Sequence, residues 1–117
     1  MPRHWRLRID DILDAIDRIQ QYVQGLAQAQ FEADDRTRDA VLYNLQTIGE
    51  AVSQLPAEIT SEYKDVPWED IRGMRNLIAH GYFAIKLPII WKTVTEDLAP
   101  LKAVVRKILD KDHDEST

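Results

Sequence analysis

The residues with the clearest chemical potential lie in one decapeptide, GMRNLIAHGY, at positions 73–82. Within it, Arg75, His80 and Tyr82 combine a strong base, an imidazole and a phenol. Arginine carries a permanent forked charge that fits a phosphate, and histidine, with an unperturbed pKa of about 6.5, exchanges protons near neutral pH. RNA contains its own nucleophile, the 2′-hydroxyl, so such a pair can cleave RNA without a metal by moving a proton and stabilising charge. The residue types therefore indicate phosphate chemistry.

The spacing alone does not bring Arg75 and His80 together. Positions five apart on a straight α-helix diverge by about 140°, at about 100° per residue. The two side chains can cooperate if the helix opens after His80, if the long arginine reaches around, or if a second subunit completes the pair. An extended chain beyond that point would place His80 and Tyr82 on the same side. The structural alternative pairs Arg75 with Glu69 or Asp70 and makes His80 a helix-end cation.

Helical periodicity dominates the remaining sequence, because apolar residues recur every three or four positions and no alternating strand pattern appears. The expected helices span about 7–26, about 35–55 with Asp34, Asp35 or Thr37 as the cap, 68–79 and 88–108, with a short helical turn at 56–63. Pro100 should bend or break the last helix, because proline removes a backbone donor. The sequence therefore predicts an all-α fold, an up-and-down bundle of four main helices plus a short helical turn.

Size and composition fit one globular domain. The chain has 117 residues, of which 44% are hydrophobic and 30% charged. We expect a single domain over 1–117, with a flexible acidic tail from about 110 to 117. The net charge of -5 argues against broad nucleic-acid binding, which needs many cation–phosphate contacts, but allows a small basic site. No apolar run approaches the roughly 18 residues of a membrane span, and the start resembles no signal peptide, so we expect a cytoplasmic protein without membrane contact.

The available side chains also limit the cofactors. The sequence contains no cysteine, which excludes disulfides, thiol nucleophiles and cysteine-ligated zinc. It contains no HExxH motif, EF-hand loop or phosphate-binding glycine loop. We therefore expect no metal and no bound nucleotide cofactor.

Gly49 stands in the middle of the second expected helix, where glycine costs about 1 kcal/mol relative to alanine. With Gln46 and Ser53 it forms a face of low bulk that another helix can approach closely, in the same subunit or in a second one. The alternative is that the helix simply tolerates this glycine. This face and the poor geometry of Arg75 and His80 within one helix predict an obligate homodimer, which Gly49→Leu should disrupt.

The decapeptide resembles the signature of the HepT family in the HEPN superfamily: Arg, four residues, His, one residue, Tyr. Here it runs from Arg75 to Tyr82 without departure. The segments NLQTIGEA at 44–51, PWEDIRGMRN at 67–76 and YFAIKLPIIW at 82–91 resemble the other characteristic segments of that family in order and spacing. The resemblance therefore covers nearly the whole chain and implies a HEPN-like helical fold.

The resemblance also implies a function. It implies a metal-independent endoribonuclease toxin that dimerises, with Arg75 and His80 as catalytic residues in a cleft shared by the two subunits. It further implies that a minimal nucleotidyltransferase, the MNT-type antitoxin, attaches AMP to Tyr82. Asn76 matches the usual residue of the family and can orient phosphate or histidine. Arg72, three residues before Arg75 and so on the same helix face, is the best further contact for RNA phosphate.

One alternative uses the same residues differently. A catalytically silent helical dimer could bind a nucleotide or a protein partner through the same Arg/His cleft. The ribonuclease interpretation makes growth arrest depend on His80, whereas the binding interpretation does not.

Overall fold

The computed structural model describes residues 4–77 and 86–116, with side chains described as far as 112. Its elements are α1 (His4–Val23), α2 (Gln28–Ala33), α3 (Asp35–Ser53), α4 (Ala57–Thr60), α5 (Trp68–Gly73), the 3₁₀ helix η1 (Met74–Asn76), α6 (Leu87–Lys92), the π-helical segment η3 (Thr93–Asp97) and α7 (Leu98–Ser116). Most of the described residues are helical, and none of them forms a β-strand. The prediction of an all-α bundle is confirmed.

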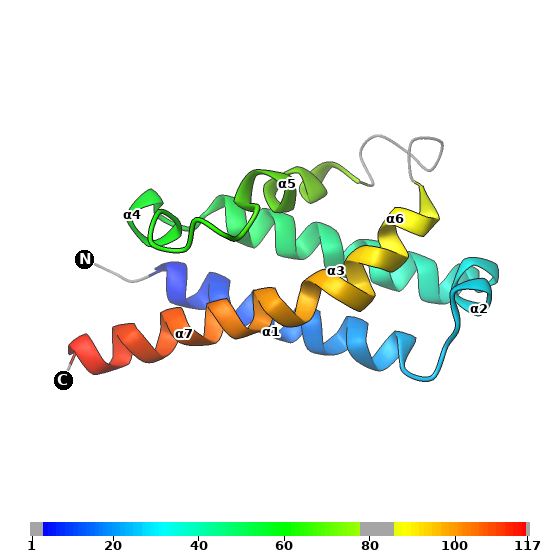
Figure 1. Cartoon of the computed structure of the whole chain (residues 1–117), viewed down its shortest axis with the longest axis horizontal. Helices are drawn as coiled ribbons and strands as arrows, with labels where there is room; N and C mark the ends of the chain where they lie inside the picture. Colours follow the sequence, from blue (N-terminus) through cyan, green and yellow to red (C-terminus); the bar gives the residue numbers. More distant parts are fainter. Residues whose placement is uncertain (1–3, 78–85, 117) are drawn as a thin grey trace.

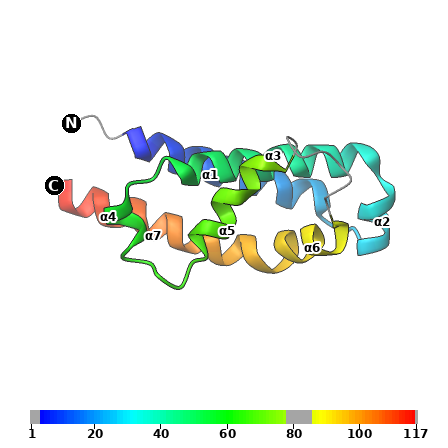
Figure 2. The ribbon, with the colours of Figure 1, turned by 90° about the horizontal axis from the view of Figure 1, so that it is seen from above.

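The long helices lie along the length of the molecule (Figure 1). α1 and α3 run in opposite directions and pack on each other, and α1 also packs on α7. α5 runs obliquely across the long helices (Figure 2), and α5 and η1 both pack on α3. The segment that begins the decapeptide is therefore held against the middle layer of the bundle.

A core of apolar side chains joins these elements. α1 contributes Ile9, Ile12, Ile16 and Ile19, all fully buried, as its three-and-four spacing predicts. The same cluster includes residues of α3 and α7, with Phe31 of α2 and Trp68 of α5. No helix in the described part of the chain is long and apolar enough to cross a membrane.

The polar segment before α3 contains a helix that the sequence analysis missed. Phe31 of α2 is fully buried, and its ring centroid lies 5.3 Å from that of Trp91. The side chain of Gln30 accepts a hydrogen bond from the Ala27 backbone N–H at 2.8 Å, which satisfies a free donor at the helix start. With one buried aromatic residue among polar neighbours, α2 has no apolar period to reveal it.

Asp34 is the cap of α3, among the three candidates considered. Its carboxylate accepts hydrogen bonds from the Thr37 hydroxyl at 2.8 Å and from the Thr37 backbone N–H at 3.2 Å. These bonds, with the hydroxyl contact as the larger effect, hold the pKa of Asp34 below its usual value. The cap fixes where α3 begins, and α3 in turn supports the decapeptide.

Pro100 disturbs the last helix without ending it. α6, η3 and α7 follow one another without a break from Leu87 to Ser116, and η3 has the wider π-helical winding. A proline ring meets the carbonyl four residues earlier, here that of Glu96 within η3. The wider winding accommodates that conflict locally, as π-bulges do in continuous helices.

The last helix runs past its expected end at 108, because α7 is helical through residue 116. The flexibility expected of the tail from about residue 110 stays a prediction. The Lys111 Nζ lies 2.8 Å from the Glu62 Oε2 beyond α4, and the Asp112 Oδ2 lies 3.3 Å from the Arg6 Nε on α1. These ion pairs join the end of α7 to two other parts of the fold. The acidic composition that suggested fraying supplies one partner of such pairs.

Candidate active site

Arg75 and Asn76 lie on η1, and both are exposed. His80 and Tyr82 lie outside the described residues, as does the helix end expected at His80-Gly81. The approach of His80 to Arg75 therefore stays a prediction.

The winding of η1 changes the geometric argument about the motif. The expected helix from 68 to 79 is α-helical only as far as Gly73, and Met74–Asn76 then form a 3₁₀ turn. A 3₁₀ helix has about three residues per turn, so the straight α-helix assumed for the divergence of about 140° does not hold at Arg75 and Asn76. Arg72 is three residues before Arg75, at the end of α5, so the two side chains lie about one helical turn apart and near the same side.

Gly49 makes the close approach that its lack of a side chain suggested, but the approaching backbone belongs to the same chain. A Cβ atom built on Gly49 would lie 2.5 Å from the backbone nitrogen of Arg75 and 2.8 Å from the carbonyl oxygen of Ile71. Gly49 is buried under α5 and η1. The close approach at Gly49 is therefore made within the subunit, so Gly49 gives no argument for a homodimer.

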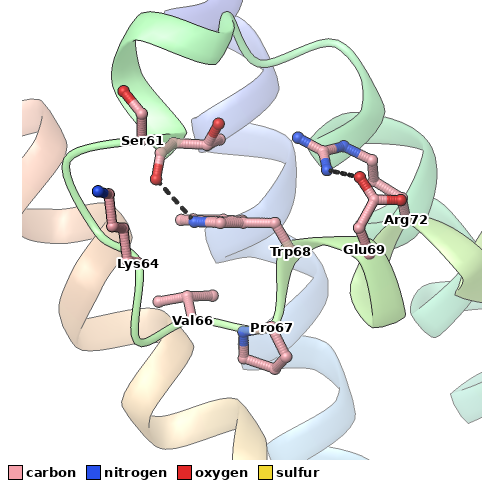
Figure 3. A pocket seen from close by; sticks show the side chains of 8 residues that line it. Ser61, Lys64, Val66, Pro67, Trp68, Glu69 and Arg72 are labelled. Carbon is pink, nitrogen blue, oxygen red and sulfur yellow. Dashed lines mark hydrogen bonds and ion pairs between the residues drawn. The ribbon is translucent and has the colours of Figure 1, made fainter.

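Arg72 and Arg75 differ in their contacts with carboxylates. Arg72 Nη1 lies 2.6 Å from the Oε1 of Glu69, which is the carboxylate that we considered as a partner for Arg75 (Figure 3). Among the described residues, Arg75 has no ion-pair or hydrogen-bond partner for its guanidinium. The structural alternative that pairs Arg75 with Glu69 or Asp70 is thus not seen in this part of the chain. No described side chain therefore competes with an anionic ligand for this exposed guanidinium.

The pair between Arg72 and Glu69 does not prevent Arg72 from contacting a phosphate. The Glu69 side chain is 90% exposed, and exposed ion pairs contribute only about 0–1 kcal/mol. A phosphate of a bound polyanion can therefore replace the carboxylate at the same guanidinium. The sequence alone could have predicted the ion pair between Arg72 and Glu69, because the two residues are oppositely charged and three apart on a helix.

Trp68 anchors the start of α5 beside a hollow of about 390 Å³. Its indole N–H donates to the carbonyls of Thr60 and Tyr63, both at 3.0 Å. Figure 3 shows the ring between Lys64 on one side and the Arg72–Glu69 pair on the other. Trp68 is 8% exposed, so it serves the fold by fixing the connection before α5 rather than offering a surface for base stacking.

The family comparison extends over both the helices and the decapeptide. A family model described as "Ribonuclease HepT-like" matches residues 12–108, a range that includes Arg75, His80 and Tyr82. The chain belongs to this family. The HEPN-like resemblance read from the sequence is therefore confirmed at the level of the family.

Individual relatives of this HepT-like protein agree with the family match. A Thermococcus cleftensis protein named "Probable ribonuclease HepT" is 32% identical over 108 residues, which cover 92% of this chain and 98% of the relative. A Caldanaerobacter subterraneus protein named "Putative RNase" is 34% identical over 104 residues, covering 89% and 93% of the two chains. No solved structure gives a significant match. The family and these names support ribonuclease activity.

Proposed function

We propose that this HepT-like protein is a metal-independent endoribonuclease toxin that acts in the cytoplasm, with Arg75 and His80 as its catalytic residues. The observation that carries the proposal is the exposed guanidinium of Arg75, which has no partner among the described residues, within a chain of a ribonuclease family. An exposed guanidinium on a helical turn offers its forked donors to the phosphate that is cleaved.

The proposed reaction uses the RNA's own 2′-hydroxyl. His80 accepts the proton of this hydroxyl while the 2′-oxygen attacks the adjacent phosphorus. Arg75 stabilises the negative charge that develops on the phosphoryl oxygens. The bond from phosphorus to the 5′-oxygen then breaks, and that oxygen takes up a proton from the imidazolium. The products are a 2′,3′-cyclic phosphate and a 5′-hydroxyl, and no step requires a metal.

Two further residues support this reaction in the proposal. Asn76 follows Arg75 on η1 and is exposed, so its amide can orient the phosphate or His80. Arg72 binds a neighbouring RNA phosphate, which replaces Glu69 in the exposed ion pair. A small basic site of this kind suits a protein whose net charge is -5, because only a few phosphates are contacted.

The regulation and assembly also belong to the proposal. We propose that an MNT-type nucleotidyltransferase antitoxin adds AMP to Tyr82, and that two copies of the chain form a homodimer in which the two motifs share a cleft. The family membership supports both statements. Gly49 does not support the dimer, because the chain's own α5 and η1 pack against it.

Growth on expression separates a ribonuclease from a silent binding dimer. We expect expression of the wild-type chain to arrest cell growth, and we expect His80→Ala to relieve the arrest at equal protein level. His4→Ala is the matched control, because His4 is an exposed histidine at the start of α1. Arrest that persists with His80→Ala would favour a protein that acts by binding alone.

A further inference from the structure

α3 and η1 come unusually close at Gly49. The three atoms nearest to a Cβ built there are all backbone atoms: the Arg75 nitrogen at 2.5 Å, the Ile71 oxygen at 2.8 Å and the Met74 carbonyl carbon at 3.0 Å. Real Cβ atoms essentially never have neighbours nearer than 3.0 Å. Backbone atoms cannot swing aside as the end of a long side chain can, so any side chain at Gly49 must move η1 away from α3.

The contacts of α5 and η1 make a displacement of η1 act on Arg75. Ile71, Met74 and Leu77 are packed against the core beside α3. Trp68 fixes the other end of α5 through its hydrogen bonds to Thr60 and Tyr63. The backbone nitrogen closest to Gly49 is that of Arg75, and it is directly bonded to the Arg75 Cα. The distance between η1 and α3 therefore sets the position of the Arg75 side chain.

We propose that Gly49 is a positioning residue for Arg75, and this proposal rests on the function proposed above. The missing side chain lets η1 sit at the depth from which the guanidinium reaches the RNA phosphate. A displacement of about 1 Å at a reacting group can lower a rate by about 10²-fold. Gly49 therefore acts on the reaction through the backbone of Arg75 and touches no substrate itself.

Gly73 provides a matched control within the same segment. It is exposed at the end of α5, and a Cβ built on it meets nothing within 4 Å. Its φ is -62°, which any residue adopts. Gly73→Ala therefore adds the same methyl group to the same segment without displacing it, and the helix gains the higher propensity of alanine.

The first experiment compares cleavage of a mixed-sequence single-stranded RNA oligonucleotide. We expect Gly49→Ala to lower kcat/KM by about 10- to 100-fold while keeping the helical circular dichroism and cooperative unfolding of wild type. Gly73→Ala should stay within about twofold of wild type, since it moves no catalytic group. A Gly49→Ala protein that cleaves at the wild-type rate would overturn the inference.

A second measurement distinguishes positioning from a general loss of packing. RNA affinity is measured against salt concentration in a His80→Ala background, where the oligonucleotide stays intact. Loss of one phosphate contact to single-stranded RNA lowers the salt slope by about 0.7. We expect Gly49→Ala and Arg75→Ala each to lower the slope by that amount, and the double variant to lower it no further. Independent, additive losses would contradict a role through Arg75.

The remaining outcomes are also decisive. If Gly49→Ala unfolds, it is combined with the stabilising Gly73→Ala, and failure of that double variant to fold means that Gly49 serves the fold rather than Arg75, which overturns the inference. If Arg75→Ala cleaves RNA normally, both the proposed function and the inference about Gly49 are wrong. If Arg75→Ala is inactive but Gly49→Ala is fully active, only the inference fails.

Discussion

Arg75→Ala and His80→Ala should each abolish RNA cleavage while leaving the helical fold intact. Proton transfer by a positioned side chain contributes about 10²–10⁴ in rate, and removal of a preorganised charge stabiliser costs about 10²–10³. Arg75 is exposed and has no partner among the described residues, so its truncation removes little packing. Cleavage of a labelled RNA, with circular dichroism as the check on folding, measures both effects.

Arg72→Ala is the control for charge alone. Like Arg75→Ala it removes one positive charge from the same segment, but Arg72 is assigned to a neighbouring phosphate rather than to the reacting one. We therefore expect weaker RNA binding and a smaller loss of kcat than for Arg75→Ala.

Full activity of His80→Ala would show that the acid–base mechanism is wrong.

Tyr82→Phe should preserve cleavage yet escape neutralisation by the antitoxin. The substitution keeps the aromatic ring and removes the oxygen proposed to accept AMP. On wild type, we expect an added AMP to bring negative charge into the proposed site, where its phosphate would occupy the guanidinium fork of Arg75 and repel the RNA backbone. The alternative is that Tyr82 only packs at the helix end, as tyrosines often do.

Intact mass spectrometry after coexpression with the nucleotidyltransferase measures this modification. Wild type should gain AMP-sized increments and lose ribonuclease activity, whereas Tyr82→Phe should gain none and remain active. Tyr63→Phe is the matched control, because it removes a phenolic oxygen outside the motif. If Tyr82→Phe gains the same increments as wild type, or if wild type gains none, Tyr82 is not the modified residue.

The fold was largely predictable from apolar periodicity. The long helices α1, α3 and α7 carry this pattern because each buries one apolar stripe in the shared core, with α1 packed on both of the other two. α2 was missed because Phe31 alone gives no period, and its burial depends on Trp91, far along the sequence. The length of α7 was underestimated because its acidic residues suggested fraying, whereas the Asp112 Oδ2 lies 3.3 Å from the Arg6 Nε on α1.

The residues of the candidate site were read from the sequence and stay a prediction, whereas the packing that holds Arg75 in place could not be read from it. The types and order of Arg75, His80 and Tyr82 identified the motif, which needs no tertiary information. The sequence marked Gly49 as a position of close approach, yet it could not tell whether the approaching backbone came from the same chain. That answer depends on how α5 crosses α3, which local propensity does not encode.

Cleavage of matched RNA and DNA strands in EDTA is the most direct test of the central claim. The purified wild-type chain is incubated with a single-stranded RNA and with the all-deoxy strand of the same sequence, and the product ends are identified by mass spectrometry. The account predicts that the RNA alone is cut, leaving 2′,3′-cyclic phosphate and 5′-hydroxyl ends, because the 2′-hydroxyl is the nucleophile and no metal takes part. Cleavage that requires added Mg²⁺, or that cuts the DNA strand equally well, would contradict it.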